Sequence, residues 1–183
     1  MNPGPGAQPA GLPPFLIRPE RAGDEPAIDA LTQGAFREHP LSRHTETLTL
    51  AILRRTGALA VSLVAEAGGA IRGHVAFSAV TVSGGADGWF ALGPLAVAGS
   101  HRNQGMGGAL VGQGLRTLRE RAASGCVVLG DPVYFHRFGF RSTPALRLEG
   151  APPGCFLVRP FRRAVPLGSV RYHVAFDATL PVT

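Results

Sequence analysis

The sequence predicts an α+β fold, with one mixed, mostly antiparallel sheet flanked by helices. Three stretches of the chain predict it. Residues 24–57 place apolar side chains at helical spacing, which indicates two helices. Residues 59–97 alternate in side-chain character and are interrupted by glycine-rich turns, which is typical of an antiparallel meander. Residues 95–130 follow the order strand, glycine-rich turn, helix, strand.

Length and composition fit one domain. The 183 residues are 45% hydrophobic and 16% charged, so we assign residues 15–183 to a single domain with a full core. Residues 1–14 contain five prolines, three glycines and no charge, and we expect them to be a disordered lead-in. No apolar run approaches the ~20 residues of a membrane span, so no membrane partner is expected. Cys126 and Cys155 suggest the reduced thiols of a cytoplasmic protein, with a disulfide between them left open.

The elements of the first half are bounded by capping and turn residues. Asp24 suits the N-cap of a helix that runs to about Phe36. Ser42 or Thr45 can cap a second helix, which ends at Gly57. The four strands expected here are Phe15–Arg18, 59–66, 71–82 and 89–97, with a hairpin turn at Gly68-Gly69.

The second half begins with a helix expected from about residue 105 to Ser124. Pro132 suits the first turn of a short helix. Pro94 lacks an N–H, so it predicts a bulge or a parting within the strand that holds it. The remaining strands, which would complete the same sheet, are 126–130, 156–161 and 170–176.

The segment 95–110 is the most informative about function. An apolar strand breaks at Gly99, and Arg102-x-x-Gly105-x-Gly107 then opens the helix. The first four N–H groups of a helix lack intrahelical partners, and the helix macrodipole adds about half a positive charge there. Glycines let a bulky phosphate approach the backbone. The sequence therefore predicts a phosphorylated ligand at this turn.

Other phosphate-binding loops fit less well. A P-loop requires a lysine, and the chain has none, which excludes it. The dinucleotide-binding fingerprint Gly-x-Gly-x-x-Gly is incomplete in this sequence, because Leu110 stands at the position of the third glycine. Asp131, however, lies where a ribose-binding acid would fall, so a nicotinamide- or flavin-binding protein stays an alternative. An ordinary tight turn before a helix is the other alternative.

The turn resembles the acyl-CoA-binding signature of the GNAT superfamily of N-acyltransferases, where the Arg-x-x-Gly-x-Gly sequence follows a strand such as 93–97. The segment 134–140, Tyr-Phe-His-Arg-Phe-Gly-Phe, resembles the later aromatic signature of the same superfamily. The two signatures have the expected order and separation. The resemblance covers about residues 15–140.

The resemblance implies that the strands 89–97 and 126–130 run parallel and splay apart, so that pantetheine of acetyl-CoA enters between them. Backbone groups of Leu95 and Val97 would bind the pantetheine amides, and the N–H groups from Arg102 to Gly108 would hold the pyrophosphate without a metal. A strand N–H near Leu95 would also polarise the thioester carbonyl. The cofactor-binding residues implied are Leu95, Ala96, Val97, Arg102, Asn103, Gln104, Gly105, Met106, Gly107, Gly108 and Phe135.

The activity implied is direct transfer of an acetyl group from acetyl-CoA to a primary amine. Superfamily members often carry a tyrosine acid at the position of Phe135, which cannot donate a proton. Tyr134 precedes it and would point elsewhere on a helix, yet we retain it as a catalytic candidate. A non-catalytic acyl-CoA-binding module is therefore an alternative.

Deprotonation of the acceptor is the larger chemical requirement. An alkyl amine of pKa ~10.4 is mostly protonated at neutral pH, whereas a thiol of pKa ~8.5 leaves readily as the thiolate. Asp131 ends a strand beside the predicted splay and is the base candidate, with capping of the next helix as its structural alternative. The other protonatable groups have readier structural or surface roles: Glu38, His39, Glu66, His74 and His136.

The charge balance favours an anionic ligand. All 18 positive side chains are arginines, and the net charge of +6 suits coenzyme A. The arginines are scattered from Arg18 to Arg171 without a basic block, so nucleic acid is not an expected partner. The identity of the amine is open, and so is the choice between a monomer and a homodimer.

Overall fold

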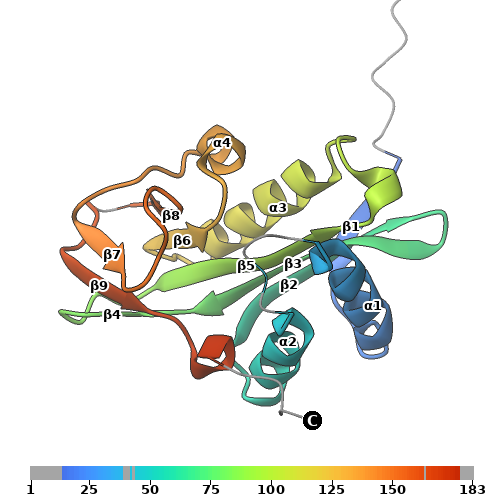
Figure 1. Ribbon diagram of the computed structural model, residues 1–183, viewed down its shortest axis with the longest axis horizontal. Helices are drawn as coiled ribbons and strands as arrows, with labels where there is room; N and C mark the ends of the chain where they lie inside the picture. The colour runs from blue at the N-terminus through green and yellow to red at the C-terminus, as the bar shows by residue number, and fades with distance from the viewer. Residues whose placement is uncertain (1–13, 39–41, 43, 163, 178–183) are drawn as a thin grey trace, which may run out of the picture.

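Six strands form a central sheet in the computed structural model, which describes residues 14–38, 42, 44–162 and 164–177 (Figure 1). Their order is β1-β2-β3-β5-β6-β8, and every neighbouring pair is antiparallel except β5 with β6. The predicted mixed, mostly antiparallel sheet is confirmed. The strands are β1 (Leu16–Pro19), β2 (Leu59–Ala67), β3 (Ala70–Ala79), β5 (Trp89–Val97), β6 (Gly125–Leu129) and β8 (Phe156–Pro160). All but the last residue of the predicted lead-in, 1–14, lie outside the described residues.

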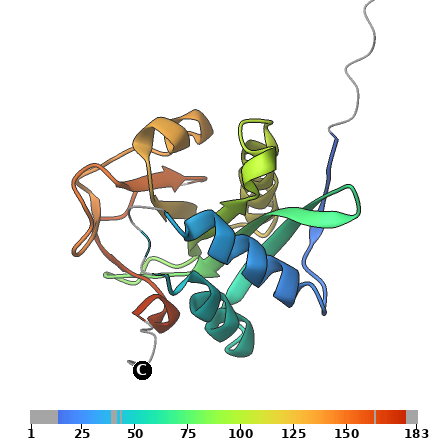
Figure 2. The same cartoon turned by 45° about the vertical axis from the view of Figure 1, so that its right-hand side comes forward.

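Helices cover both faces of this sheet (Figures 1 and 2). On one face lie α1 (Glu25–Phe36) and α2 (Glu46–Arg55), which bury Ile28 and Leu50 against the sheet. On the other face lies α3 (Met106–Glu120), which packs against Val75 and Phe77 of β3. Successive side chains of a strand point to opposite faces, so β3 contributes to both layers.

A glycine lets α3 approach the sheet closely. A Cβ built on Gly114 would lie 2.1 Å from Cε2 of Phe77, which no real structure tolerates. The Phe77 ring therefore fills the space that a side chain at this helix position would need. This packing fixes α3, and with it the turn at its N-terminus, relative to β3 and β5.

A second, smaller sheet corrects part of the prediction. Its order is β4-β9-β7, with β4 (Thr81–Val82), β7 (Leu146–Leu148) and β9 (Gly168–Arg171). The predicted strand 71–82 is split, because β3 ends at Ala79 and β4 pairs with β9 instead of β5. The predicted strand 170–176 ends at Arg171 and gives way to the 3-10 helix η3 (Val174–Asp177). Neither β7 nor this second sheet was predicted.

The helix ends also differ from prediction in detail. α3 ends at Glu120 rather than Ser124, because Ala122 adopts a left-handed conformation with φ of 60°. Asp24 occupies the N-cap position of α1, but its carboxylate accepts from Arg18 Nη1 and from the Arg21 N–H instead of capping. Thr45 is the N-cap residue of α2 and likewise makes no side-chain cap.

Candidate functional site

Strands β5 and β6 part after a short parallel pairing. The pairing runs on β5 from Trp89 to Leu92 and goes no further. A register shift against β3 follows, where two residues of β5, Gly93 at φ 147° and Pro94, face the single residue Ala76 of β3. Only glycine adopts such a φ readily, and proline has no N–H to pair. Both the bulge and the parting predicted from Pro94 are confirmed.

Beyond the bulge, one edge of β5 is unpaired. The Ala98 N–H donates to Arg72 O at 2.8 Å, on the β3 side. Because the backbone groups of successive strand residues point to opposite edges, Leu95 and Val97 turn theirs toward the gap. Val97 O accepts from Arg102 Nε at 3.3 Å. This edge is open to an extended ligand that adds to the sheet like another strand.

The turn before α3 presents a row of backbone amides. Gly105 is the N-cap residue of α3 at φ 83°, and its carbonyl accepts from the Ala109 N–H at 2.9 Å. Within the described part of the chain, the N–H groups of residues 103–108 donate to no protein acceptor. The Arg102 N–H donates to Gly99 O at 3.3 Å, so the predicted row begins one residue later than expected.

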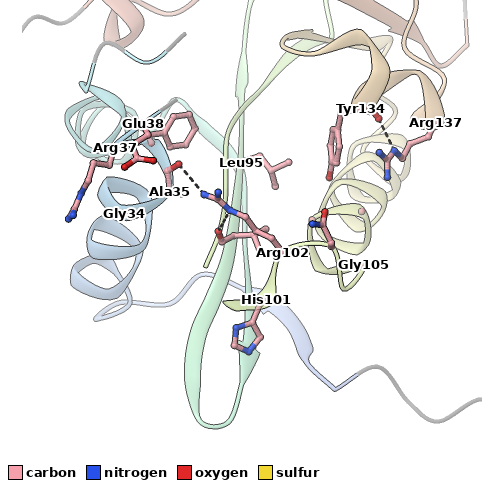
Figure 3. Close-up of a pocket in the computed structure, with 15 residues that line it drawn as sticks. Gly34, Ala35, Arg37, Glu38, Leu95, His101, Arg102, Gly105, Tyr134 and Arg137 are labelled. Atoms are coloured by element: carbon pink, nitrogen blue, oxygen red, sulfur yellow. Dashed lines mark hydrogen bonds between the residues drawn. The ribbon is translucent and has the colours of Figure 1, made fainter. Parts of the chain in front are cut away.

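These amides open onto a cavity of about 1020 Å³ (Figure 3). The C-terminal end of α1 forms one wall, the start of α3 with Tyr134 forms the other, and Leu95 lies between them. Arg102 reaches across to α1, where its Nη2 donates to Ala35 O at 3.2 Å. Three arginines and one glutamate line the cavity: Arg37, Arg102, Arg137 and Glu38. The excess of positive charge suits an anionic ligand.

Tyr134 stands over the start of α3. A Cβ built on Gly107 would lie 2.8 Å from Tyr134 Oη and 3.5 Å from Val97 Cγ2, so Gly107 leaves the space that the phenol occupies. Arg137 stacks on the Tyr134 ring, with Cζ 4.5 Å from the centroid, and its Nε donates to Tyr134 O at 2.9 Å. Burial raises the pKa of the phenol, and the charge of Arg137 opposes this only in part. Tyr134 therefore keeps its proton at neutral pH.

The expectation that Tyr134 points away from the site is wrong. The two aromatic residues of the short helix α4 (Pro132–Phe135) do diverge, but Tyr134 reaches the cavity and Phe135 packs into the core. The Phe135 ring meets Phe140 edge to face, with centroids 5.8 Å apart. A Cβ on Gly130 would lie 2.5 Å from Phe135 Cε2, so glycine at this position admits the ring.

A second cavity of about 560 Å³ adjoins the first. The two share Phe36, Leu95 and Tyr134, so Tyr134 lies at their junction. The second cavity is walled by the start of α2, the middle of β5 and the end of β6 where these strands part, the loop after β7, and η3. Two ligands, one in each cavity, would therefore meet at the splay.

Asp131 lines the second cavity and also caps α4. Its Oδ1 accepts from the Val133 N–H at 2.8 Å. This is the structural role that the sequence left open beside catalysis. No ion pair among the described residues involves this exposed carboxylate.

The other protonatable candidates fall into separate places. Glu66 accepts from Arg18 at the sheet edge, with Oε1 3.0 Å from Nε. Glu38 lines the first cavity, whereas His136 lines neither. His39 lies outside the described residues.

His74 belongs to a buried polar network beneath α1 and α2. Its Nε2 lies 2.9 Å from Ser62 Oγ, which also bonds to Glu20. Arg54 Nε donates to Glu20 Oε1 at 2.7 Å. Burial opposes ionisation of Glu20, but the nearby His74 and the hydrogen bonds from Ser62 and Arg54 outweigh it and lower the pKa of this carboxyl to about 2. Burial lowers the pKa of His74. No member of the network lines either cavity, so we assign it a structural role.

Most of the predicted cofactor-binding residues meet at the first cavity. Its lining includes Leu95, Val97, Arg102, Asn103, Gly105, Gly107 and Gly108. Ala96 and Met106 are buried, Gln104 donates to Ser100 O, and Phe135 lines only the second cavity. Sequence reasoning missed Arg137, which the match to the aromatic signature contained, and the carboxylates Glu46, Glu149 and Asp177, which no local pattern marks.

The described residues contain neither a metal-binding cluster nor a membrane-spanning helix. Within residues that the structure describes, no group of three or more His, Cys, Asp or Glu side chains is arranged to hold a metal ion. No helix in those same residues has the length and apolar character needed to cross a membrane.

Sequence relatives of this chain are acetyltransferases by name. Residues 27–140 match the acetyltransferase (GNAT) family. The chain is 40% identical over 170 residues to the uncharacterized N-acetyltransferase YhbS of Escherichia coli strain K12, which covers 89% of this chain and 99% of the relative.

Solved structures agree with the sequence relatives. A GNAT family acetyltransferase from Brucella melitensis, crystallised with acetyl-CoA, aligns with a TM-score of 0.80 at 40% identity, covering 89% of this chain and 98% of that one. YhbS from Escherichia coli, crystallised with CoA, aligns with a TM-score of 0.83 at 34% identity, covering 94% and 97%. With the parted strands, the amide row and these relatives together, the chain belongs to the GNAT family of acetyltransferases.

Proposed function

We propose that this protein transfers an acetyl group from acetyl-CoA to a primary amine by direct attack. The observation that carries the proposal is the meeting of two cavities at Tyr134, one beside free backbone amides and the other lined by carboxylates. The relatives crystallised with acetyl-CoA or CoA support the choice of cosubstrate. Free thiols at Cys126 and Cys155 fit the reducing cytoplasm as the site of action.

The residues of the first cavity fit coenzyme A. The N–H groups of residues 103–108 would hold the pyrophosphate, with added positive charge from Arg102 and Arg137. The backbone groups that Leu95 and Val97 turn toward the gap, where no strand pairs with them, would bind the pantetheine amides. The absence of a Cβ at Gly107 lets the Tyr134 hydroxyl lie against the start of α3, beside these amides. Several charge-assisted hydrogen bonds of ~1.5–3 kcal/mol each anchor such a ligand without a metal.

The reaction requires one nucleophile and two proton movements. The amine nitrogen bonds to the acetyl carbon, the carbon–sulfur bond breaks, and the electron pair of that bond leaves with sulfur. We assign Tyr134 as the acid that protonates the departing sulfur, because it borders both cavities and keeps its proton at neutral pH. We assign Asp131 as the base that takes the proton of the amine, directly or through water, since it lines the second cavity.

Titration calorimetry with acetyl-CoA tests the first step. We expect saturable binding to the full chain with a micromolar Kd, which an absence of binding at tens of micromolar would overturn. Thiol release across a panel of primary amines tests the second step. Turnover that falls in Asp131→Asn supports direct attack with this base. Tight binding with slow, amine-independent thiol release that Asp131→Asn leaves unchanged would instead favour a non-catalytic acyl-CoA-binding module.

A further inference from the structure

The second cavity carries a charge opposite to that of the chain as a whole. The chain has 18 arginines against 12 acidic residues. Yet all charged residues that line this cavity within the described part of the chain are acidic: Glu46, Asp131, Glu149 and Asp177. The adjoining first cavity is lined by three arginines and one carboxylate. The two halves of the site therefore differ in sign.

Among the described residues, no cationic side chain neutralises these four carboxylates. None takes part in an ion pair among the described residues. Glu46 accepts from Ser42 Oγ at 2.6 Å, and Asp131 accepts from a backbone N–H. Unpaired like charges around one cavity repel one another and attract a positively charged ligand. A metal ion does not fit that description, because the described carboxylates form no group arranged to ligate one.

The acidic residues come from separate elements that the fold holds together. Glu46 starts α2, and Asp177 ends η3, which Figure 1 shows beside α2. Thr49 Oγ1 donates to Ala175 O at 3.1 Å, and this buried bond fixes η3 on α2. Asp131 and Glu149 stand in the loops that follow β6 and β7. Negative charge thus comes from four separate segments that line the cavity.

A buried phenol forms part of the wall of the same cavity. Tyr172 lines the same cavity, and its hydroxyl is buried without a hydrogen-bond partner in the described residues. Its ring is held edge to face by Phe176, with centroids 5.0 Å apart. This pair of rings ties η3 to the residue that follows β9 and so shapes this wall of the cavity.

We infer that the acetyl acceptor is a small amine with at least two protonated nitrogens. This inference rests on the proposed function. One nitrogen, after losing its proton, attacks at the splay, and the other stays charged against Glu149 and Asp177. The cavity of about 560 Å³ has the size of a small-molecule site. Glu149 and Asp177 are then specificity-determining residues for the second charge, while acetyl transfer itself does not require them.

Matched amines of equal length test the second charge. The panel is 1,4-diaminobutane, 4-amino-1-butanol and 4-aminobutanoate, which differ only in whether the far group is positive, neutral or negative. We expect kcat/KM, followed by thiol release, to be about 10-fold higher for the diamine than for the amino alcohol, and lowest for the amino acid. We expect the preference to shrink as the salt concentration rises. Equal kcat/KM values for the three would overturn the inference.

Variants and a binding measurement separate this inference from the proposed function. Asp177→Asn and Glu149→Gln should lower kcat/KM for the diamine several-fold more than kcat/KM for the amino alcohol. Glu120→Gln, an exposed carboxylate at the end of α3, is the matched control and should change neither. Calorimetry of the CoA-bound chain should give tighter binding of the diamine than of the amino alcohol. Selective binding without turnover would refute the proposed function alone, and turnover without selectivity would refute the inference alone.

Discussion

Replacing Gly107 by valine perturbs the proposed pyrophosphate site directly. The new Cβ would lie 2.8 Å from Tyr134 Oη, which must move, and 3.5 Å from Val97 Cγ2, so the valine side chain crowds the cavity wall next to the amides of residues 103–108. Loss of one charge-assisted hydrogen bond costs about 1.5–3 kcal/mol. At 1.4 kcal/mol per tenfold change, this weakens CoA binding about 10- to 100-fold.

Gly112→Val is the matched control. Gly112 lies on the same helix, and a Cβ there meets no atom within 4 Å. Because valine and glycine differ little in helix propensity, both variants should melt close to the parent temperature. Calorimetry with CoA and thermal unfolding by circular dichroism measure the two effects. Unchanged affinity in Gly107→Val, or an equal loss in Gly112→Val, would refute the reasoning and make the loop an ordinary turn.

Three other changes have definite expected outcomes. Tyr134→Phe should lower kcat about 10²-fold and change CoA affinity little. This is the low end of the range for a general acid, because the thiolate leaves readily. A wild-type kcat for this variant in stopped-flow thiol release would contradict the assignment. Gly130→Ala should lower the urea-unfolding free energy by about 1–3 kcal/mol, because the new Cβ would lie 2.5 Å from Phe135 Cε2. The low pKa of Glu20 stabilises the fold above pH ~4.5, and up to about 3 kcal/mol is lost as pH falls toward 2. Glu20→Gln should flatten that part of the stability curve, and an unchanged curve would speak against the network.

The sequence predicted those elements that are determined by residues close together in the chain. The helix from Asp24 to Phe36, the hairpin at Gly68-Gly69 and the bulge at Pro94 follow from spacing, glycine conformation and the missing proline N–H. The small second sheet could not be predicted, because β4, β7 and β9 are two to four residues long and pair across distant parts of the chain. Such pairings are set by tertiary contacts rather than by propensity.

In the site too, features set by local sequence were predicted and features set by tertiary contacts were not. The amide row at residues 103–108 was predicted almost to the residue, since it is one contiguous turn before a helix. The side-chain direction of Tyr134 was not, because it depends on how α4 docks and on the space beside Gly107 and Gly130. The acidic lining of the second cavity comes from four separate segments, so no spacing in the sequence marks it.

Amide hydrogen exchange with and without CoA tests the central claim most directly. If the backbone N–H groups of residues 103–108 hold the pyrophosphate, saturating CoA should protect these amides and those of the free β5 edge at Leu95 and Val97 far more than the rest of the chain. Saturable binding that leaves the exchange of residues 103–108 unchanged would contradict the account, and so would protection confined to a different part of the molecule.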